Sequence, residues 1–197
     1  MGGSVLDLEH LLWGLLASAE KIFSTTKLRH LWQRLNGCHY TLSDCWQYPQ
    51  ILQRQLGFSS RECAAITALK QSSALADWKT HLLANRWQIL IYSDDFFPPL
   101  LRQIPDYPVV LFLSGNPKCL LQPSLAVVGS RKNSDYGRLC VRTLLNSNLR
   151  GFNIVSGLMT GIDALAHQRA LSQGLSTVAV LSRSEEHTSE LQSPTSI

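Results

Sequence analysis

Residues 125–131 read LAVVGSR, residues 152–163 read FNIVSGLMTGID, and residues 176–181 read STVAVL. Short β-branched runs of this kind are typical of buried strands, and the first two runs end in turns that contain glycine. Right-handed crossovers make such strands parallel and place both strand-to-helix turns at the carboxyl edge of one sheet, so the two turns should converge on one crevice. We therefore predict strands at 125–128, 152–155 and 176–181, joined by helices near 136–149 and 162–171.

The residues of these two turns predict a phosphate-binding site. Glycine lets backbone N–H groups approach a ligand closely, and a following helix N-terminus favours an anion. Serine and threonine hydroxyls add donors, and Arg131 and Lys132 add positive charge at the same rim. From Lys118 to Ala170 the chain has seven basic residues against two acidic ones. The predicted phosphate-binding residues are Gly129, Ser130, Arg131, Lys132, Ser156, Gly157, Thr160 and Gly161.

Asp163 and His167 lie four residues apart on one face of the second predicted helix. Asp163 is either a catalytic or ribose-binding carboxylate or the acidic residue that a first helical turn favours, which would brace the loop. His167 is either a base or a structural histidine, and no nucleophile stands at a recognisable spacing from it. The turns also lack the GxGxxG pattern of dinucleotide-binding proteins, and no acidic residue ends the second strand. We therefore expect no dinucleotide cofactor.

The N-terminal part of the chain, residues 5–84, has helical periodicity, with leucines recurring three to four residues apart. Ser59 and Glu62 form a capping-box pattern that predicts a helix over 61–70. The runs WQILIY at 87–92 and VVLFL at 109–113 predict two strands. Nothing in the helices indicates a chemistry, so they form either an interaction or DNA-contacting module or a purely structural cap.

Composition excludes several classes of protein. With 197 residues and 45% hydrophobic residues the chain can bury a real core. The apolar run 11–19 is about half of the roughly 20 residues that a membrane span needs, and the N-terminus lacks the cationic region of a secretory signal. The five cysteines include no CxxC pair, which indicates reduced thiols, and we expect no metal site. We expect a soluble, cytoplasmic protein.

The last fifteen residues, 183–197, change character abruptly. They have no hydrophobic period, and the run RSEEHTSELQS is similar to the translation of a common sequencing-adapter DNA. We expect a non-native tail here, with a natural polar tail as the alternative. Without it, residues 1–182 have 17 basic and 11 acidic residues, a formal charge of +6.

A longer set of strings carries a family resemblance: AVVGSRKNSDYG at 126–137, GFNIVSGLMTGIDALAHQRAL at 151–171 and then STVAVL. Together with FFPPLL at 96–101 and PVVLFLSGN at 108–116, they resemble the DNA-processing protein A family (DprA, also called Smf) of natural transformation. The resemblance implies an α/β fold, a Rossmann-like parallel sheet that is incomplete at its C-terminal side, preceded by a small all-α domain that is sterile-alpha-motif-like or helix-hairpin-helix. The expected domains are residues 1–84, residues 85–182 and the tail 183–197.

The resemblance implies a protein without enzymatic activity. Members of the family bind single-stranded DNA that enters a bacterial cell, protect it, and help to load the RecA recombinase. The family's GSR turn corresponds to 129–131, and its SGxxxGID turn corresponds to 156–163 with His167 following. The resemblance also implies a homodimer in the intact protein and no membrane partner. Met159 and Thr160 depart from the family pattern, so one backbone contact to phosphate is in doubt.

Two other classes of function stay open. Relatives of the same fold include phosphoribohydrolases of the Lonely Guy type, which act on nucleotides, although this chain contains neither their PGGxGT turn nor their paired Arg and Glu. The third possibility is a protein-interaction adaptor that works through residues 1–84 alone.

Overall fold

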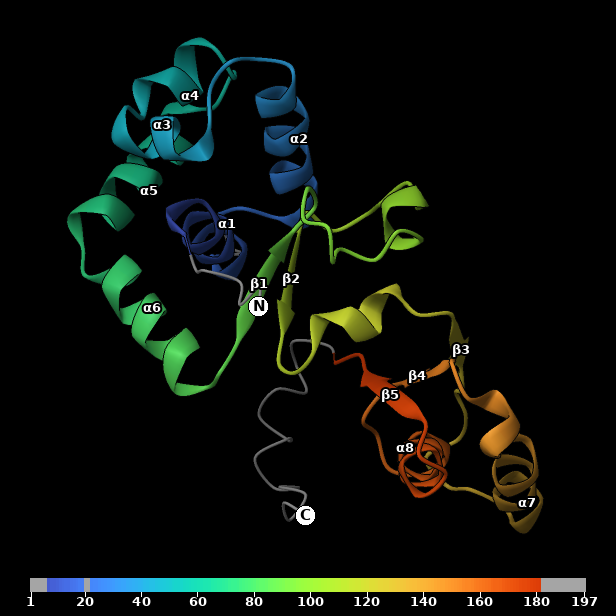
Figure 1. The fold of residues 1–197 in the computed structure, drawn as a ribbon. Coiled ribbons are helices and arrows are strands. Elements are labelled where there is room, and N and C mark those ends of the chain that lie inside the picture. The colour runs from blue at the N-terminus through green and yellow to red at the C-terminus, as the bar shows by residue number, and fades with distance from the viewer. Residues whose placement is uncertain (1–6, 20–21, 182–197) are drawn as a thin grey trace. The chain divides into compact units, whose positions relative to one another are not determined.

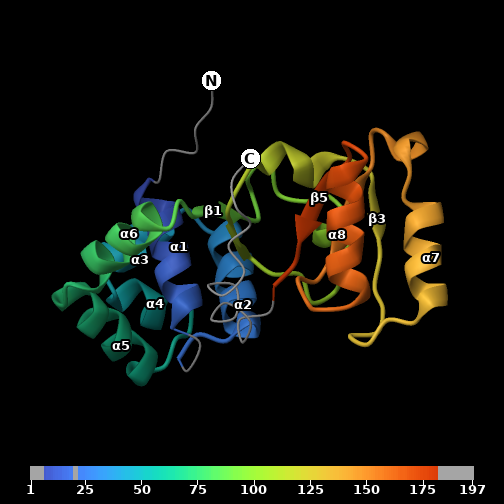
Figure 2. The same cartoon turned by 90° about the horizontal axis from the view of Figure 1, so that it is seen from below.

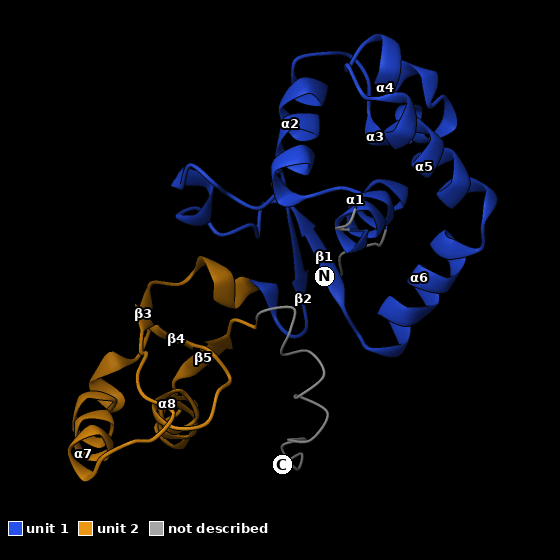
Figure 3. Cartoon of the chain, turned by 180° about the vertical axis from the view of Figure 1, so that it is seen from behind, with its two compact units in different colours: residues 1–117 blue, residues 118–197 orange. Residues whose placement is uncertain are grey.

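The structure is a computed structural model that describes residues 7–19 and 22–181. The chain divides into two compact units, residues 1–117 and residues 118–197 (Figure 3). Each unit has a hydrophobic core of its own. In the part of the chain that the structure describes, no helix has the length and apolar character needed to span a membrane. The predicted tail, 183–197, lies outside the described residues.

Unit 1 starts with helices and ends with a two-stranded antiparallel sheet (Figures 1 and 2). A short 3-10 helix, η1 (Leu101–Gln103), lies between the strands. The sheet pairs Gln88 with Leu113 and Ile91 with Val110. The elements are α1 (Leu8–Ser18), α2 (Thr25–Asn36), α3 (Leu42–Gln47), α4 (Gln50–Arg54), α5 (Ser60–Gln71), α6 (Ala74–Ala84), β1 (Gln88–Ile91) and β2 (Val110–Leu113).

Helix α1 is the centre of this unit. It lies among the other elements of the unit and contacts α2, α3, α6 and both strands (Figure 1). It buries Leu12, Trp13 and Leu16 completely. Strand β1 packs directly on it, because a Cβ at Gly14 would lie 2.4 Å from the Cδ1 atom of Ile89. The glycine therefore lets the sheet approach the helix closely. Burial of these large apolar side chains is the main stabilising contribution to the unit.

Glu9 joins α1 to α3. Its carboxylate accepts hydrogen bonds from the backbone N–H groups of Leu42 (3.0 Å) and Ser43 (3.1 Å), the first two residues of α3. It also accepts from the Ser43 hydroxyl at 2.8 Å and from the Trp13 indole at 3.2 Å. A negative charge at a helix N-terminus is stabilised by the helix dipole, so Glu9 fixes the start of α3.

The predicted capping box at the start of α5 is present. The Glu62 N–H donates to the Ser59 hydroxyl at 3.3 Å, and the Ser59 N–H donates to the Glu62 carboxylate at 2.9 Å. Lys27 Nζ lies 2.7 Å from Glu62 Oε1, and the bonds to Lys27 and Ser59 lower the Glu62 pKa to about 2. The sequence pattern alone was sufficient to find this helix start.

We expect Ser59→Ala to lower the free energy of unfolding of unit 1 by about 1 kcal/mol, because the first turn of α5 loses its acceptor. Ser73→Ala is the matched control, since Ser73 precedes α6 and its hydroxyl donates to the Asp77 carboxylate rather than accepting a backbone N–H of the helix. Urea denaturation followed by tryptophan fluorescence reports on this unit, because all five tryptophans precede residue 118. Equal losses in the two variants would contradict a capping role for Ser59.

Unit 2 contains a parallel three-stranded sheet in the order β3-β4-β5. Its register places Leu125, Ile154 and Thr177 side by side. Because each crossover is right-handed and the strands follow in chain order, both helices pack on one face, where Ile154 is fully buried. The elements are β3 (Ser124–Ala126), α7 (Asp135–Leu144), β4 (Asn153–Ser156), α8 (Ile162–Ser172) and β5 (Ser176–Ala179), with the 3-10 helices η2 (Pro117–Leu121) and η3 (Ser147–Leu149).

The predicted β-α-β-α-β order is confirmed, and several element ends differ from the prediction. Helix α7 ends at Leu144 rather than near 149, because Leu145 takes extended angles (φ −86°, ψ 94°) and Asn146 caps the 3-10 helix η3. Strands β3 and β5 are shorter than predicted, although the Val127 N–H still donates to Val155 O at 2.9 Å.

The division between the units also differs from the predicted boundary between residues 84 and 85. Strands β1 and β2 belong to unit 1, because Ile89, Ile91 and Val109 are buried in the same core as the helices. A pattern of apolar residues shows that a segment is a strand, but it does not show which neighbour will cover that strand.

Candidate functional site

The two predicted turns of unit 2 lie against each other. The Ile162 N–H, at the start of α8, donates to Ser130 O in the turn after β3 at 3.1 Å. Gly129 faces the same residue, since a Cβ there would lie 2.7 Å from Ile162 Cβ. Gly161 has a φ of +100°, and a Cβ on it would lie 2.2 Å from Ser130 O and 2.6 Å from Arg131 O. The expected convergence is therefore a direct backbone contact that depends on two glycines.

The turn after β3 presents charge to solvent. Gly129, Ser130, Arg131 and Lys132 are all exposed. The Ser130 hydroxyl donates to Lys132 O at 2.8 Å and accepts from the Lys132 N–H at 3.1 Å, which holds the turn in one conformation. Within residues 7–19 and 22–181, no hydrogen bond or ion pair engages the side chain of Arg131 or Lys132. Both positive charges are free to meet an anionic ligand.

The turn after β4 is built differently from the prediction. Ser156 is buried, and its hydroxyl donates to Val127 O on the neighbouring strand at 2.6 Å. Its only proton is thus committed to the sheet. The Ile162 and Ala164 N–H groups donate to Ser130 O and Met159 O, so they too have protein acceptors. Thr160 is exposed. Positive charge at this site comes mainly from the first turn rather than from the N-terminus of α8.

His167 connects three elements. Its ring is buried, Nε2 lies 2.7 Å from Gly157 O, and Nδ1 lies 2.6 Å from the Thr177 hydroxyl on β5. A carbonyl can only accept, so Nε2 donates the proton that binds the turn, while the Thr177 hydroxyl beside Nδ1 donates its own proton to Ile154 O at 2.9 Å. This geometry is that of a brace which holds the second turn to β5.

Asp163 lies in the first turn of α8, beside the second turn. A Cβ at Gly157 would lie 2.8 Å from Asp163 Oδ2, and Oδ1 is buried without a hydrogen-bond partner among the described residues. The dipole of α8 favours a negative charge at this position. The two turns therefore differ in charge, with free cations on the first and a carboxylate beside the second.

Arg169 has a role that its sequence context did not reveal. It contributes to the basic excess of residues 118–170, yet its guanidinium donates to Leu145 O at 2.9 Å and to Arg142 O at 3.0 Å. These are carbonyls at the C-terminal end of α7, where a cation is stabilising. Its charge supports the packing of the two helices. No spacing rule links residue 169 to the end of the preceding helix.

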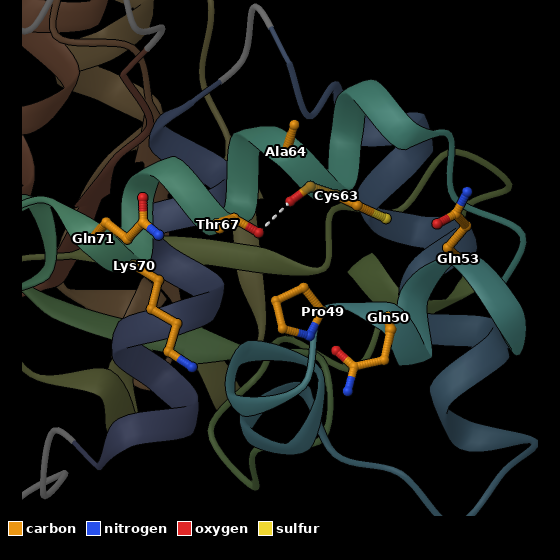
Figure 4. A pocket seen from close by; sticks show the side chains of 8 residues that line it. All are labelled: Pro49, Gln50, Gln53, Cys63, Ala64, Thr67, Lys70 and Gln71. Carbon is orange, nitrogen blue, oxygen red and sulfur yellow. Dashed lines mark hydrogen bonds between the residues drawn. The ribbon is translucent and has the colours of Figure 1, made fainter.

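The predicted site residues lie on an open surface. A groove of about 620 Å³ lies between α7 and α8, and a hollow of about 570 Å³ lies between α4 and α5, where Gln50, Gln53, Thr67 and Lys70 line it (Figure 4). Neither includes a residue of the two turns. In the described part of the chain, no group of three or more His, Cys, Asp or Glu side chains is arranged to hold a metal ion. An open basic rim suits a long anionic ligand better than an enclosed small molecule.

Comparison with known proteins finds a family whose model matches the second half of the chain. The family described as DNA recombination-mediator protein A matches residues 88–192, which is more than half of the chain. The chain belongs to this family. The matched range contains both turns and β1 to β5, and it leaves out α1 to α6. It also extends into the predicted tail, at residues outside the described part.

Individual relatives agree with this assignment. The chain is 44% identical over 88 residues to DNA processing protein DprA of Streptococcus pneumoniae R6, covering 45% of this chain and 31% of that protein. It is 45% identical over 97 residues to Protein Smf of Escherichia coli K12, covering 47% and 25% of the two chains. The chain thus matches only a quarter to a third of these relatives' length. An X-ray structure of DprA from Streptococcus pneumoniae has a TM-score of 0.49 to this chain at 24% identity, covering 85% of this chain and 64% of that one.

Proposed function

We propose that unit 2 binds single-stranded DNA through the turn Gly129–Lys132 at the carboxyl edge of a Rossmann-like sheet. The observation that supports this most directly is the pair of exposed, unengaged cations, Arg131 and Lys132, on a turn held by its own hydrogen bonds. Proteins that bind single strands without sequence preference use a positive groove that tracks the backbone. Gly157, Thr160 and Gly161 shape the second turn beside this basic turn, and Ser156 and His167 brace the second turn.

The finer parts of the function are proposals as well. We propose that the protein acts with the RecA recombinase, that it does so as a homodimer, and that it is not an enzyme. The family description, DNA recombination-mediator protein A, supports a role together with a recombinase. Helices α1 to α6 lie outside the family match, and for them, as the helical part of unit 1, we propose a contact with DNA or protein.

Fluorescence anisotropy with a labelled oligo(dT) tests the binding of DNA. We expect affinity to fall steeply with salt, and Arg131→Ala to lower it about fivefold and to reduce the slope of log affinity against log salt by roughly 0.7, the effect of losing one phosphate contact on a single strand. The matched control is Arg150→Ala, which removes the same charge from an exposed residue before β4, at the opposite edge of the sheet.

Two outcomes would refute the proposed function. One is affinity that does not depend on salt, and the other is an equal effect of the Arg131 and Arg150 substitutions. Release of free base from AMP by the purified chain would favour the nucleotide-processing alternative instead. Binding that stays unchanged in both variants would place the contact elsewhere, in the helical unit.

A further inference from the structure

The aromatic residues of unit 2 are not used in its core. From Lys118 to Leu181 the chain has two aromatic side chains, Tyr136 and Phe152. They are 76% and 42% exposed. The core of unit 2 is made of aliphatic side chains, whereas unit 1 buries Trp13 completely, together with Phe23 and Phe97. A large apolar ring left in solvent gives up the stabilisation that burial would provide. Both rings are thus available to a ligand.

The two rings lie at opposite edges of the sheet. Tyr136 is in the first turn of α7, the helix that follows the basic turn, whereas Phe152 directly precedes β4. The first turn of α7 is fixed in place: the Gly137 N–H donates to the Ser134 hydroxyl at 3.1 Å, and a Cβ on Gly137 would lie 3.0 Å from Ile162 Cδ1. Ile162 also packs on Gly129. Tyr136 therefore shares one edge of the unit with Arg131 and Lys132.

We propose that Tyr136 is a stacking platform for a base of the strand whose phosphates meet Arg131 and Lys132. This inference rests on the proposed function. It adds a contact with a base to a site that otherwise contacts only the phosphates of the strand. Every nucleobase has a π-face, so a stacking ring tolerates any sequence. In a duplex the faces of the bases are already stacked on each other, so such a ring would select single strands. A tyrosine hydroxyl, with an ordinary pKa of about 10, is uncharged at neutral pH and does not repel phosphate; the neighbouring Cys140 raises the pKa of Tyr136 further.

The test compares two strands of equal length and charge, oligo(dT) and an abasic strand that has the sugar-phosphate backbone without bases. We expect Tyr136→Ala to weaken binding of oligo(dT) roughly tenfold, within the range measured for removal of one stacking ring. On the abasic strand the same variant should bind as well as the wild-type chain. Tyr136→Phe should restore binding of oligo(dT), because it keeps the ring. Phe152→Ala is the matched control and should bind both strands as the wild type does.

The outcomes separate this inference from the proposed function. Salt-dependent binding of both strands by the wild-type chain, with an equal effect of Tyr136→Ala on the two strands, overturns the stacking role and leaves phosphate binding in place. A loss in Phe152→Ala as large as in Tyr136→Ala overturns it as well. No salt-dependent binding of either strand by the wild-type chain overturns both. Equal urea midpoints of Tyr136→Ala and Tyr136→Phe in circular dichroism show that a difference in binding is not a difference in folding.

Discussion

Gly161→Ala should destabilise unit 2 by about 3 kcal/mol or more and abolish the binding of DNA that we propose for this unit. Gly161 has φ +100° and ψ −134°, a region that is essentially restricted to glycine. The new methyl carbon would lie 2.2 Å from Ser130 O and 2.6 Å from Arg131 O. These are backbone atoms, so no side-chain rotation relieves the overlap. The two turns must separate, and the bond from Ile162 N–H to Ser130 O is lost with them.

Gly151→Ala separates the effect of the atomic overlap at residue 161 from the effect of the positive φ angle alone. Gly151 has a similar φ of +94°, but a Cβ there would meet no atom within 4 Å. Gly151→Ala should therefore cost only about 1 kcal/mol. Hydrogen exchange measured on peptides from residues 124–181 follows this unit, which contains no tryptophan. If Gly161→Ala costs no more than Gly151→Ala, then close contact of the turns is not what the glycine provides.

The arrangement of unit 2 was accessible from sequence because it depends on local patterns. The apolar runs around Val127, Ile154 and Val178 have the length and the composition typical of buried strands. Right-handed crossovers then make the strands parallel and place both strand-to-helix turns at the same edge of the sheet. The capping box at Ser59 and Glu62 is likewise a pattern within four residues. Features of this kind are decided by neighbours in the chain, so their residues are enough to predict them.

The role of individual site residues was not accessible in the same way. The sequence predicts Ser156 as a phosphate-binding residue, but the register of β4 on β3 directs its hydroxyl to Val127 O. The start of the second helix was predicted to favour an anion, but the Ile162 N–H there donates to Ser130 O. Both bonds join segments about 30 residues apart, and no spacing rule connects them. Arg131 and Lys132 keep the expected exposure because their turn is closed by its own residues.

The packing of β1 on α1 was also beyond sequence patterns. It depends on Gly14 opposite Ile89, residues separated by most of unit 1, and on a loop after β1 that returns to the start of α1. The contact between His10 in α1 and Asp94 in this loop holds the loop to the helix. The division of the chain at residue 117 rather than near 84 follows from these contacts.

His10 makes the stability of unit 1 depend on pH. Its Nδ1 lies 2.6 Å from Asp7 Oδ1, and its Nε2 lies 3.1 and 3.0 Å from the two carboxylate oxygens of Asp94. Both ring nitrogens face acceptors, so the ring is doubly protonated. The bond to Asp94 is the main cause that raises the His10 pKa to about 9, and Asp7 adds to it against the opposing effect of burial.

The direction of this pH dependence follows from the protonation of His10 in the folded and in the unfolded chain. An unfolded histidine has a pKa of about 6.5, so below that pH the ring is charged in both states and the two ion pairs contribute fully. Between pH 6.5 and about 9 the unfolded chain releases the proton and the folded chain keeps it, so the free energy of unfolding falls as pH rises. We expect a loss of about 2 kcal/mol across this window, because solvent screens part of the interaction.

Urea denaturation followed by tryptophan fluorescence at pH 6 and pH 9.5 measures this loss. In His10→Gln the group that titrates is gone, so the difference between the two pH values should shrink by most of that amount. At pH 9.5 the variant should be nearly as stable as the wild-type chain. His39→Gln removes an exposed histidine from the connection between α2 and α3 and should leave the pH dependence unchanged. An equal pH dependence in the wild type and His10→Gln would assign the titration to other groups and would leave the His10 to Asp94 contact without a net electrostatic contribution.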